Sequence, residues 1–392
     1  MNPYLLLGLL GLLTALATVV NNLFSPAMPA LSAALSCDPS MVQLCLTASL
    51  LGLALGHIVI GPLSDRLGRR GPLLWSMATY VVVSAALVGV PSVEVMIVLR
   101  LIQGAAAGGG IVISRSIAAD MAVGGKLMKM LAAINVINGI MPIVTPMLGG
   151  ALTAHVGVNG PFWGMLVAGV LLCAGCWFMG ETLPAERRST TGLIGTMRLF
   201  GSVARNGEAM ATIFHQAGAL VVLFANIAFT PFLLGRSGYG PEAIGLALGC
   251  NGIFTALGAG FAPALGNARR GIIISATGLM ILGLLQAVLL WSDAGLWPYE
   301  VVTCLMLVLV GVTLTSSSSH AMELSRKVAG TASAVLGAVG FVVAAVIPPL
   351  TTTGNMLYNT ALIYLAGPTM ALLFALLQRH VAQHRNMSST KL

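Results

Sequence analysis

Charge is concentrated in one short stretch of this chain, which reads Gly-Pro-Leu-Ser-Asp-Arg-Leu-Gly-Arg-Arg-Gly-Pro-Leu from Gly61 to Leu73. Its acid, Asp65, and its arginines, among them Arg66 and Arg69, can form ion pairs that break and form again. Its glycines and prolines interrupt helices. In a chain with only 8% charged residues, such a stretch indicates a signal for chain orientation, a moving joint, or both.

The composition places these residues in an integral membrane protein. Hydrophobic residues make up 57% of the sequence and charged residues 8%, against about 25% in soluble domains. Apolar runs of about 20 residues cross a bilayer as helices. The net charge of +8 is scattered through short links, which argues against nucleic-acid binding.

Twelve apolar spans, separated by charged, Gly or Pro links, predict an all-α polytopic membrane protein. The longest polar stretch, Glu181 to Met210, divides them into two pseudo-symmetric six-helix bundles. We expect an N-terminal bundle over 1–180, a cytoplasmic linker over 181–210, a C-terminal bundle over 211–378 and a cytoplasmic tail over 379–392. The expected spans are Tyr4 to Pro29, Met41 to Ile60, Leu73 to Val90, Val93 to Ala118, Met130 to His155, Phe162 to Gly180, Ala211 to Gly235, Ala243 to Ala264, Ile272 to Trp291, Pro298 to Ser319, Gly330 to Pro349, and Tyr358 to Leu377.

The distribution of Lys and Arg predicts the orientation of the chain. Apart from Arg100 and Arg115 inside span four, these residues lie in the even-numbered links and the C-terminal tail, whereas the opposite side carries only Arg236. Short cytoplasmic links hold positive residues and short external links do not. We therefore expect both termini in the cytoplasm.

Three stretches resemble signatures of the major facilitator superfamily. Gly61 to Leu73 matches its cytoplasmic signature between spans two and three, with Ser64 where alanine is commoner. Leu99 to Gly104 is similar to its fourth-span motif. Its fifth-span antiporter motif is matched in part, because Met141 and Thr145 stand where glycines are usual. The matching residues of that motif are Pro142, Pro146, Gly149 and Gly150.

Other stretches resemble the bicyclomycin and chloramphenicol resistance branch of the drug/proton antiporters. They are Ser114 to Asp120, Glu181 to Arg188, and Ala329 to Ala334. The resemblance covers essentially the whole chain and is densest in its first half. One position departs from the family, which usually has an aspartate in span one where this chain has Asn22.

The resemblance implies a gate around the charged stretch. Asp65 would hold the cytoplasmic gate against span eleven, while Arg66 or Arg69 reaches Asp120 at the base of span four. Asp65 also lies where the following helix could offer its partly positive amino end. The alternative is that these arginines only fix the orientation of the chain.

Two arginines lie within span four, where a charge costs at least about 2.5 to 3.5 kcal/mol on insertion scales. Arg115 is near the cytoplasmic end and can extend to the interface or pair with Asp120. Arg100 is followed on one helical face by Gln103 and Gly104, so another helix or a ligand can approach closely. We expect a coupling or substrate role for Arg100, and a purely structural anchor is the alternative.

Polar side chains at helical spacing mark candidate cavity positions in spans one and five. Each must face another helix or water, because an unpaired amide in hydrocarbon costs several kcal/mol. Contacts between helices explain them as well as a solute cavity does. The candidates are Thr18, Asn21, Asn22, Asn135 and Asn138, with Gln103 in span four and the single positions Asn226 and Asn251 in the second half.

The sequence places no carboxylate in the middle of a span. It therefore leaves open which residue would couple proton movement to transport of the solute. Replacement of the family aspartate by Asn22 removes the usual proton-binding acid. Coupling could instead use Asp65, Asp120 or a histidine, since histidine titrates near neutral pH. A cationic solute would lack a counter-charge, so the cargo is expected to be neutral, zwitterionic or anionic.

The resemblance to the drug/proton antiporters implies a secondary transporter of the bacterial inner membrane that exports small amphiphilic molecules in exchange for protons, and we expect it to be a monomer. A dedicated exporter of one metabolite, such as a siderophore, or an uncoupled facilitator is the alternative. We expect no cofactor, no metal and no enzymatic activity. The serines from Ser316 to Ser319 beside His320 are the one combination of residues in the sequence that could suggest a catalytic site. The simpler interpretation is a helix end built from small residues.

Overall fold

The computed structural model describes residues 3–90, 92–121, 124–188, 201, 203–324 and 329–389, and every regular element within these ranges is helical. The all-α prediction is therefore confirmed. Contacts divide the chain into two compact units. Unit 1 comprises Met1–Thr196 and Thr230–Cys250, and unit 2 comprises Met197–Phe229 and Asn251–Leu392.

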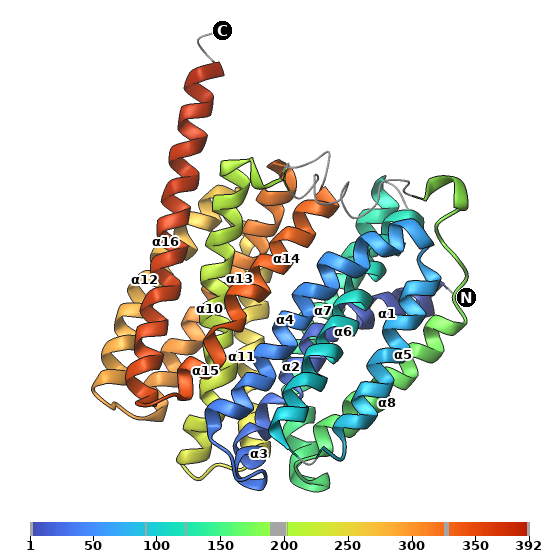
Figure 1. The fold of residues 1–392 in the computed structure, drawn as a ribbon. Helices are drawn as coiled ribbons and strands as arrows, with labels where there is room; N and C mark the ends of the chain where they lie inside the picture. Colours follow the sequence, from blue (N-terminus) through green and yellow to red (C-terminus); the bar gives the residue numbers. More distant parts are fainter. Residues whose placement is uncertain are drawn as a thin grey trace. The chain divides into compact units, whose positions relative to one another are not determined.

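The helices of the first half begin with a span that is broken into short pieces (Figure 1). They are α1 (Pro3–Thr14), α2 (Leu16–Asn22), η1 (Ser25–Ala27), α3 (Met28–Ala34), α4 (Pro39–Leu67), α5 (Arg70–Leu87), α6 (Val93–Met121), α7 (Gly124–Val156) and α8 (Gly160–Trp177), followed by η2 (Ala185–Arg187). The break separates Tyr4–Thr14 from Leu16–Ala34 by a bend of 47°.

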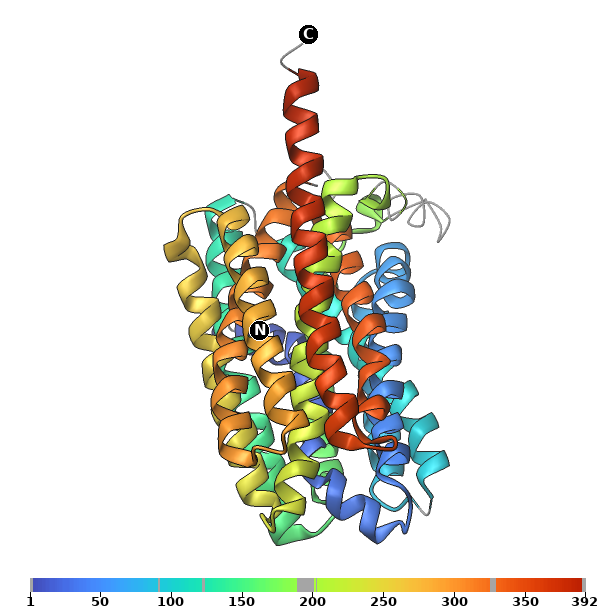
Figure 2. The same ribbon diagram turned by 90° about the vertical axis from the view of Figure 1, so that its left-hand side faces the viewer.

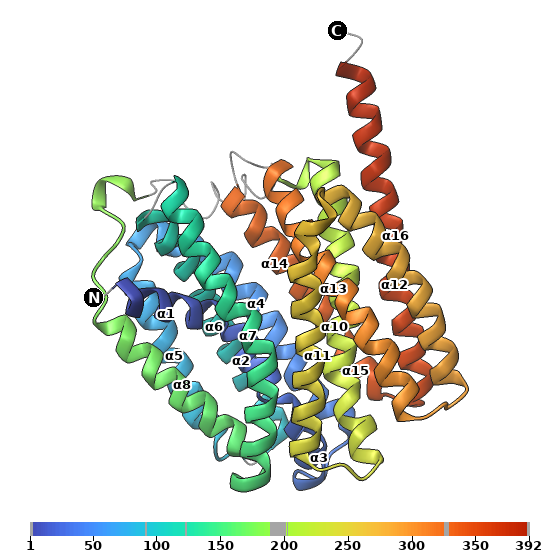
Figure 3. The ribbon, with the colours of Figure 1, turned by 180° about the vertical axis from the view of Figure 1, so that it is seen from behind.

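The second half is built from longer helices. They are α10 (Gly207–Arg236), α11 (Pro241–Phe261), η3 (Ala262–Leu265), α12 (Ala268–Trp291), α13 (Leu296–Leu324), α14 (Ala329–Ala345), α15 (Ile347–Thr352) and α16 (Met356–Ser389). In unit 2, α12 packs against both α13 and α16 (Figures 2 and 3).

Among the described residues, ten helices are long and apolar enough to cross a membrane, or eleven if the bent first pair is one span. The helix outside this set is α5, which begins with the charged Arg70. With α5 included, the described chain has a helix at each of the twelve positions expected from the apolar runs.

Two helices run further than the sequence indicates. Because α4 continues to Leu67 with Pro62 inside it, Asp65 and Arg66 lie on a helix rather than in a link. Likewise, α16 continues to Ser389, so most of the expected tail is helical, and its last turns extend past the other helices of unit 2 (Figures 1 and 3). No Gly or Pro follows Pro368 in this helix, so nothing in its sequence ends it near Leu377.

Small residues bring α4 and α6 into close backbone contact in unit 1. A Cβ atom at Gly104 would collide with the carbonyl oxygen of Ser49, and one at Gly56 would collide with that of Ala105. Small residues at a helix interface allow such close approach. The slim face expected beside Arg100 is thus occupied by another helix, α4.

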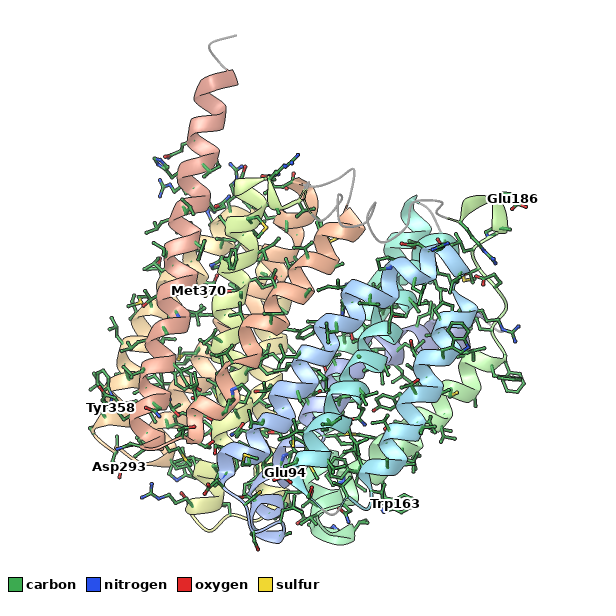
Figure 4. The ribbon with its side chains drawn as sticks, viewed as in Figure 1. Glu94, Trp163, Glu186, Asp293, Tyr358 and Met370 are labelled. Carbon is green, nitrogen blue, oxygen red and sulfur yellow. The ribbon has the colours of Figure 1, made fainter. Side chains whose placement is uncertain are left out.

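Labelled side chains mark the ends of each unit in Figure 4. Figure 4 shows Glu94 and Trp163 at one end of unit 1 and Glu186 at the other, while Asp293 and Tyr358 share one end of unit 2. The Tyr358 ring lies 6.0 Å from that of Trp291. Aromatic rings are typical of membrane interfaces.

Candidate functional site

Arg69 is the centre of a charge network at the end of unit 1 that carries the stretch Gly61 to Leu73. It lies between α4 and α5, and its side chain is buried. Its guanidinium group pairs with Asp65, and its Nε donates to Asp120 Oδ2 at 2.8 Å. Its Nη1 also donates to Ser64 Oγ at 2.9 Å. The network therefore ties the end of α4 to the end of α6.

The electrostatics of this network favour the charged arginine. Burial opposes the charge of Arg69, but the hydrogen bond to Asp120 and the nearby charge of Asp65 outweigh it, so the pKa of Arg69 is raised above its usual value. Of the two arginines considered from the sequence, the structure pairs Arg69 with Asp120. The side chain of Arg66 is exposed.

Glu181, which follows α8 in the sequence, also belongs to this network. Its carboxylate accepts the backbone N–H groups of Arg69 at 2.8 Å and Arg70 at 3.3 Å, at the amino end of α5. A helix amino end has unpaired N–H groups and favours an anion. The expectation that Asp65 takes this place is wrong, because Asp65 turns to Arg69 while Glu181 caps the helix.

The hydrogen bonds to Glu181 also set its protonation. Burial raises the pKa of this carboxyl, but the N–H groups of Leu183, Arg69, Arg70 and Thr182 have the greater combined effect, so its pKa is lowered below the usual value. Glu181 is thus a stable anion at neutral pH.

Gly68 is the turn that makes this arrangement possible. Its φ of 96° lies in the left-handed region, which side chains rarely adopt. A Cβ atom at this position would collide with Glu181 Oε2. Both the backbone angle and the space therefore require glycine here.

Arg100 forms a second polar centre, buried inside unit 1. Its side chain is 0% exposed, and Nη1 donates to Gln103 Oε1 at 2.8 Å. Nη2 donates to Val20 O at 2.9 Å, and the guanidinium lies 4.5 Å above the Phe24 ring. Val20 is in the last turn of α2, where carbonyl groups lack helical partners. Arg100 therefore caps the broken first span.

Gln103 extends this centre to a third helix. Its Nε2 donates to Ser84 Oγ at 2.8 Å, on α5. Gln103 is fully buried. Gln103 was expected to line a cavity, but it instead links α6 to α5.

The remaining candidates of unit 1 differ in their surroundings. Asn21 is buried and bonds to Ala17 O at 3.0 Å within its own helix. Asn138 Nδ2 donates to Thr14 Oγ1 at 3.0 Å and so joins α7 to α1. Thr18 and Asn22 are half-buried. Asn135 on α7 and Arg115 on α6 are both exposed.

The fifth-span motif lies against Leu23, directly after the end of α2. Pro142 and Pro146 both lie inside α7. A Cβ atom at Gly149 would collide with Leu23 O, and one at Gly150 would collide with Pro241 O. The motif thus allows close backbone approach on two sides of α7 within unit 1.

Unit 2 contains a buried polar cluster that joins four helices. Glu208 on α10 is 1% exposed, and its Oε1 accepts Arg269 Nη2 of α12 at 2.7 Å. The same oxygen lies 3.2 Å from His320 Nε2 of α13 and accepts Gln378 Nε2 of α16 at 3.1 Å. The cluster fixes one end of these helices relative to one another.

Glu300 and Asn251 form another polar contact in unit 2. Asn251 Nδ2 donates to Glu300 Oε2 at 3.3 Å, and Cys304 Sγ donates to Asn251 Oδ1 at 3.3 Å. Glu300 lies near the start of α13, four residues after Leu296, and is half-buried. Asn226 is also buried, on α10.

Three carboxylates were missed as site residues by sequence reasoning. Glu181 had a signal, because it opens the Glu-Thr-Leu-Pro stretch that resembles the drug antiporters. Glu208 and Glu300 had none. Each lies near a polar link, and its burial depends on side chains that come from distant helices.

Comparisons with known proteins agree with this architecture. The chain matches the Major Facilitator Superfamily over residues 10–349. YdgK of Bacillus subtilis, an uncharacterized MFS-type transporter, is 30% identical and aligns with 87% of this chain and 87% of its own length. A bicyclomycin resistance protein homolog of Haemophilus influenzae is 24% identical and covers 97% of this chain and 96% of its own length. A chloramphenicol resistance protein of Pseudomonas aeruginosa is 33% identical over 43% of this chain and 40% of its own length. These similarities confirm the resemblance to the bicyclomycin and chloramphenicol resistance proteins.

A solved structure shares the fold. The crystal structure of a D-xylose-proton symporter superposes with a TM-score of 0.71 at 17% identity and covers 95% of each chain. At this identity the likeness concerns the fold alone. With helices at all twelve expected positions and a family match over most of its length, the chain belongs to the Major Facilitator Superfamily.

Proposed function

We propose that this protein exports small amphiphilic molecules from the bacterial cytoplasm by alternating access, in exchange for protons. The observation that carries the proposal is the network in which Arg69 joins Asp65 and Asp120, while Glu181 caps the adjacent helix. Such contacts at a helix junction can break and form again as one bundle moves. The similarity to the bicyclomycin resistance protein homolog supports an antibiotic-like cargo.

The proposed domain arrangement has an N-terminal bundle over 1–180, a linker over 181–210, a C-terminal bundle over 211–378 and a tail over 379–392. Both termini lie in the cytoplasm, as the distribution of Lys and Arg indicates. The protein works as a monomer in the inner membrane. The ends that carry Arg69 and Arg269 then face the cytoplasm.

The proposed cargo is neutral, zwitterionic or anionic. Among the cavity candidates, Thr18, Asn22 and Asn135 have partly or fully accessible side chains. None of them carries a charge. A cationic solute that moved from water to these side chains would lose its hydration and find no carboxylate to compensate its charge, which is costly.

We propose that Arg100 does not touch the cargo but positions the candidate cavity residue Asn22. Its two terminal nitrogens are engaged by Gln103 and Val20, so it holds the broken first span in place. The position of Asn22, two residues after Val20, then depends on Arg100.

Glu300 is the proposed proton-binding group. Its hydrogen-bond partner among the described residues is Asn251, a neutral amide. It can therefore gain or lose a proton without breaking an ion pair. Glu208, by contrast, is held by the guanidinium of Arg269. Ionisable groups inside membrane helices commonly form proton relays.

The test is transport of bicyclomycin into inverted membrane vesicles with an imposed pH gradient. Uptake driven by an acidic lumen supports the proposal. Uptake that ignores the gradient indicates an uncoupled facilitator. Failure to transport bicyclomycin, together with accumulation of one cellular metabolite in a deletion strain, indicates a dedicated exporter.

A further inference from the structure

A cavity of about 320 Å³ with three arginines among its lining residues lies between α12 and α16 in unit 2. These helices pack side by side (Figure 2). Of the described side chains that line the cavity, three are arginines and none is acidic. The lining residues are Arg269, Arg270, Ile273, Gln378, Arg379, Ala382 and Gln383. Guanidinium groups bind phosphate oxygens through paired N–H donors.

Two of the residues that line the cavity, Arg269 and Gln378, are held in place by the buried carboxylate of Glu208. Arg269 Nη2 and Gln378 Nε2 both donate to the buried Glu208, at 2.7 and 3.1 Å. Gln378 Nε2 also lies 2.9 Å from His320 Nε2. A site held in place before binding loses less entropy when a ligand arrives.

The cavity keeps a surplus of positive charge after this pairing. Glu208 balances Arg269, whereas Arg270 and Arg379 are exposed and have no ion pair among the described residues. The amino end of α12, capped by Asn267, adds a partial positive charge beside Arg269 and Arg270. The complementary ligand is an anion.

The position of the cavity indicates which anion. It lies where the apolar span of α12 begins at Ala268 and that of α16 ends at Gln383, which is the level of lipid headgroups. The same helices carry exposed apolar side chains further into the span, namely Ile274 on α12 and Leu373, Leu376 and Leu377 on α16. A basic pocket above an apolar surface matches a molecule with an anionic head and apolar tails.

We propose that this cavity binds the phosphate headgroup of an anionic phospholipid. Arg270 and Arg379 contact the phosphate, and Arg269 completes the donor set with the N–H groups that do not bind Glu208. The acyl chains lie along the exposed apolar residues of α12 and α16. The site is separate from the charge network of Arg69 and does not depend on the cargo of the transporter.

The test measures binding of phosphatidylglycerol to the purified, delipidated full-length protein by native mass spectrometry, with phosphatidylethanolamine for comparison. We expect preferential binding of phosphatidylglycerol, weakened at least about tenfold in the Arg270→Gln/Arg379→Gln double variant. The matched control, Arg205→Gln/Arg236→Gln, removes the same charge at exposed positions outside the cavity and leaves binding within about twofold.

A second variant tests the cavity without a change in charge. Ala382→Trp places a large ring in the lining and should displace the lipid while Arg270 and Arg379 remain. Finally, binding of two soluble phosphates, inorganic phosphate and glycerol 3-phosphate, is measured for comparison with the lipid. Phosphatidylglycerol binding that is unchanged in both the double variant and Ala382→Trp overturns the site, and soluble phosphates that bind as tightly as the lipid overturn its assignment to a lipid.

Discussion

Arg69 Nε donates to Asp120 Oδ2 at 2.8 Å, although the two residues are 51 positions apart in the sequence. The bond joins the junction of α4 and α5 to the last turn of α6. Around it, Asp65 pairs with the same guanidinium and Glu181 caps α5.

Gly68→Ala should destabilise the protein by about 1 to 3 kcal/mol, because alanine disfavours the φ of 96° and its Cβ would collide with Glu181. The measurement is thermal unfolding in detergent. Gly71→Ala is the matched control, since a Cβ atom there meets nothing within 4 Å and alanine favours the helix. Equal destabilisation by both changes would contradict the account.

The capping of α5 by Glu181 should make stability depend on pH on the acid side. The pKa of Glu181 is lowered in the folded protein, so its contribution is complete above its ordinary pKa of about 4.3 and is lost as the pH falls through the folded value. Glu181→Gln should flatten this part of the stability profile below about pH 5. Glu186→Gln, which changes an exposed carboxylate nearby, should leave the profile as it is.

Arg100→Met should lower the unfolding free energy by about 2 to 6 kcal/mol, because it leaves two buried acceptors, Gln103 Oε1 and the Val20 carbonyl, without a donor at about 1 to 3 kcal/mol each. Transport should fall with it. Arg100→Lys keeps the charge but cannot reach both partners in the same geometry, so it should restore little of the stability. A variant with full stability and no transport would instead assign Arg100 to the cargo or the proton.

Glu300→Gln should abolish transport driven by a pH gradient, with a loss of more than about tenfold, and should spare exchange of labelled for unlabelled solute. The reason is that the glutamine occupies the same space beside Asn251 but cannot release a proton. The control is Asp293→Asn, at an exposed turn whose φ of 48° asparagine tolerates. Loss of exchange along with gradient-driven transport would assign Glu300 a structural role.

The sequence was sufficient for the helices but only partly for the site. Apolar runs predict the twelve helix positions because a bilayer demands a minimum length. The charged stretch predicted an interaction with Asp120 but not which arginine makes it. That choice depends on the turn at Gly68, which directs Arg69 inward while Arg66 stays exposed on α4.

Other parts of the site depend on contacts between distant helices. The sequence marks Arg100 as a costly charge, but its role as a cap depends on the end of α2 at Asn22, which leaves the carbonyl of Val20, 80 positions away, in the last turn. Glu208 shares a hydrogen bond with Gln378, which follows it by 170 positions. No local pattern in the sequence records such pairs.

Proton-driven export can be measured as bicyclomycin uptake into inverted vesicles under an imposed gradient of one pH unit, acid inside. Exchange of one proton per solute predicts accumulation of up to about tenfold, which collapses when a protonophore dissipates the gradient. The same uptake with and without the gradient would contradict the claim.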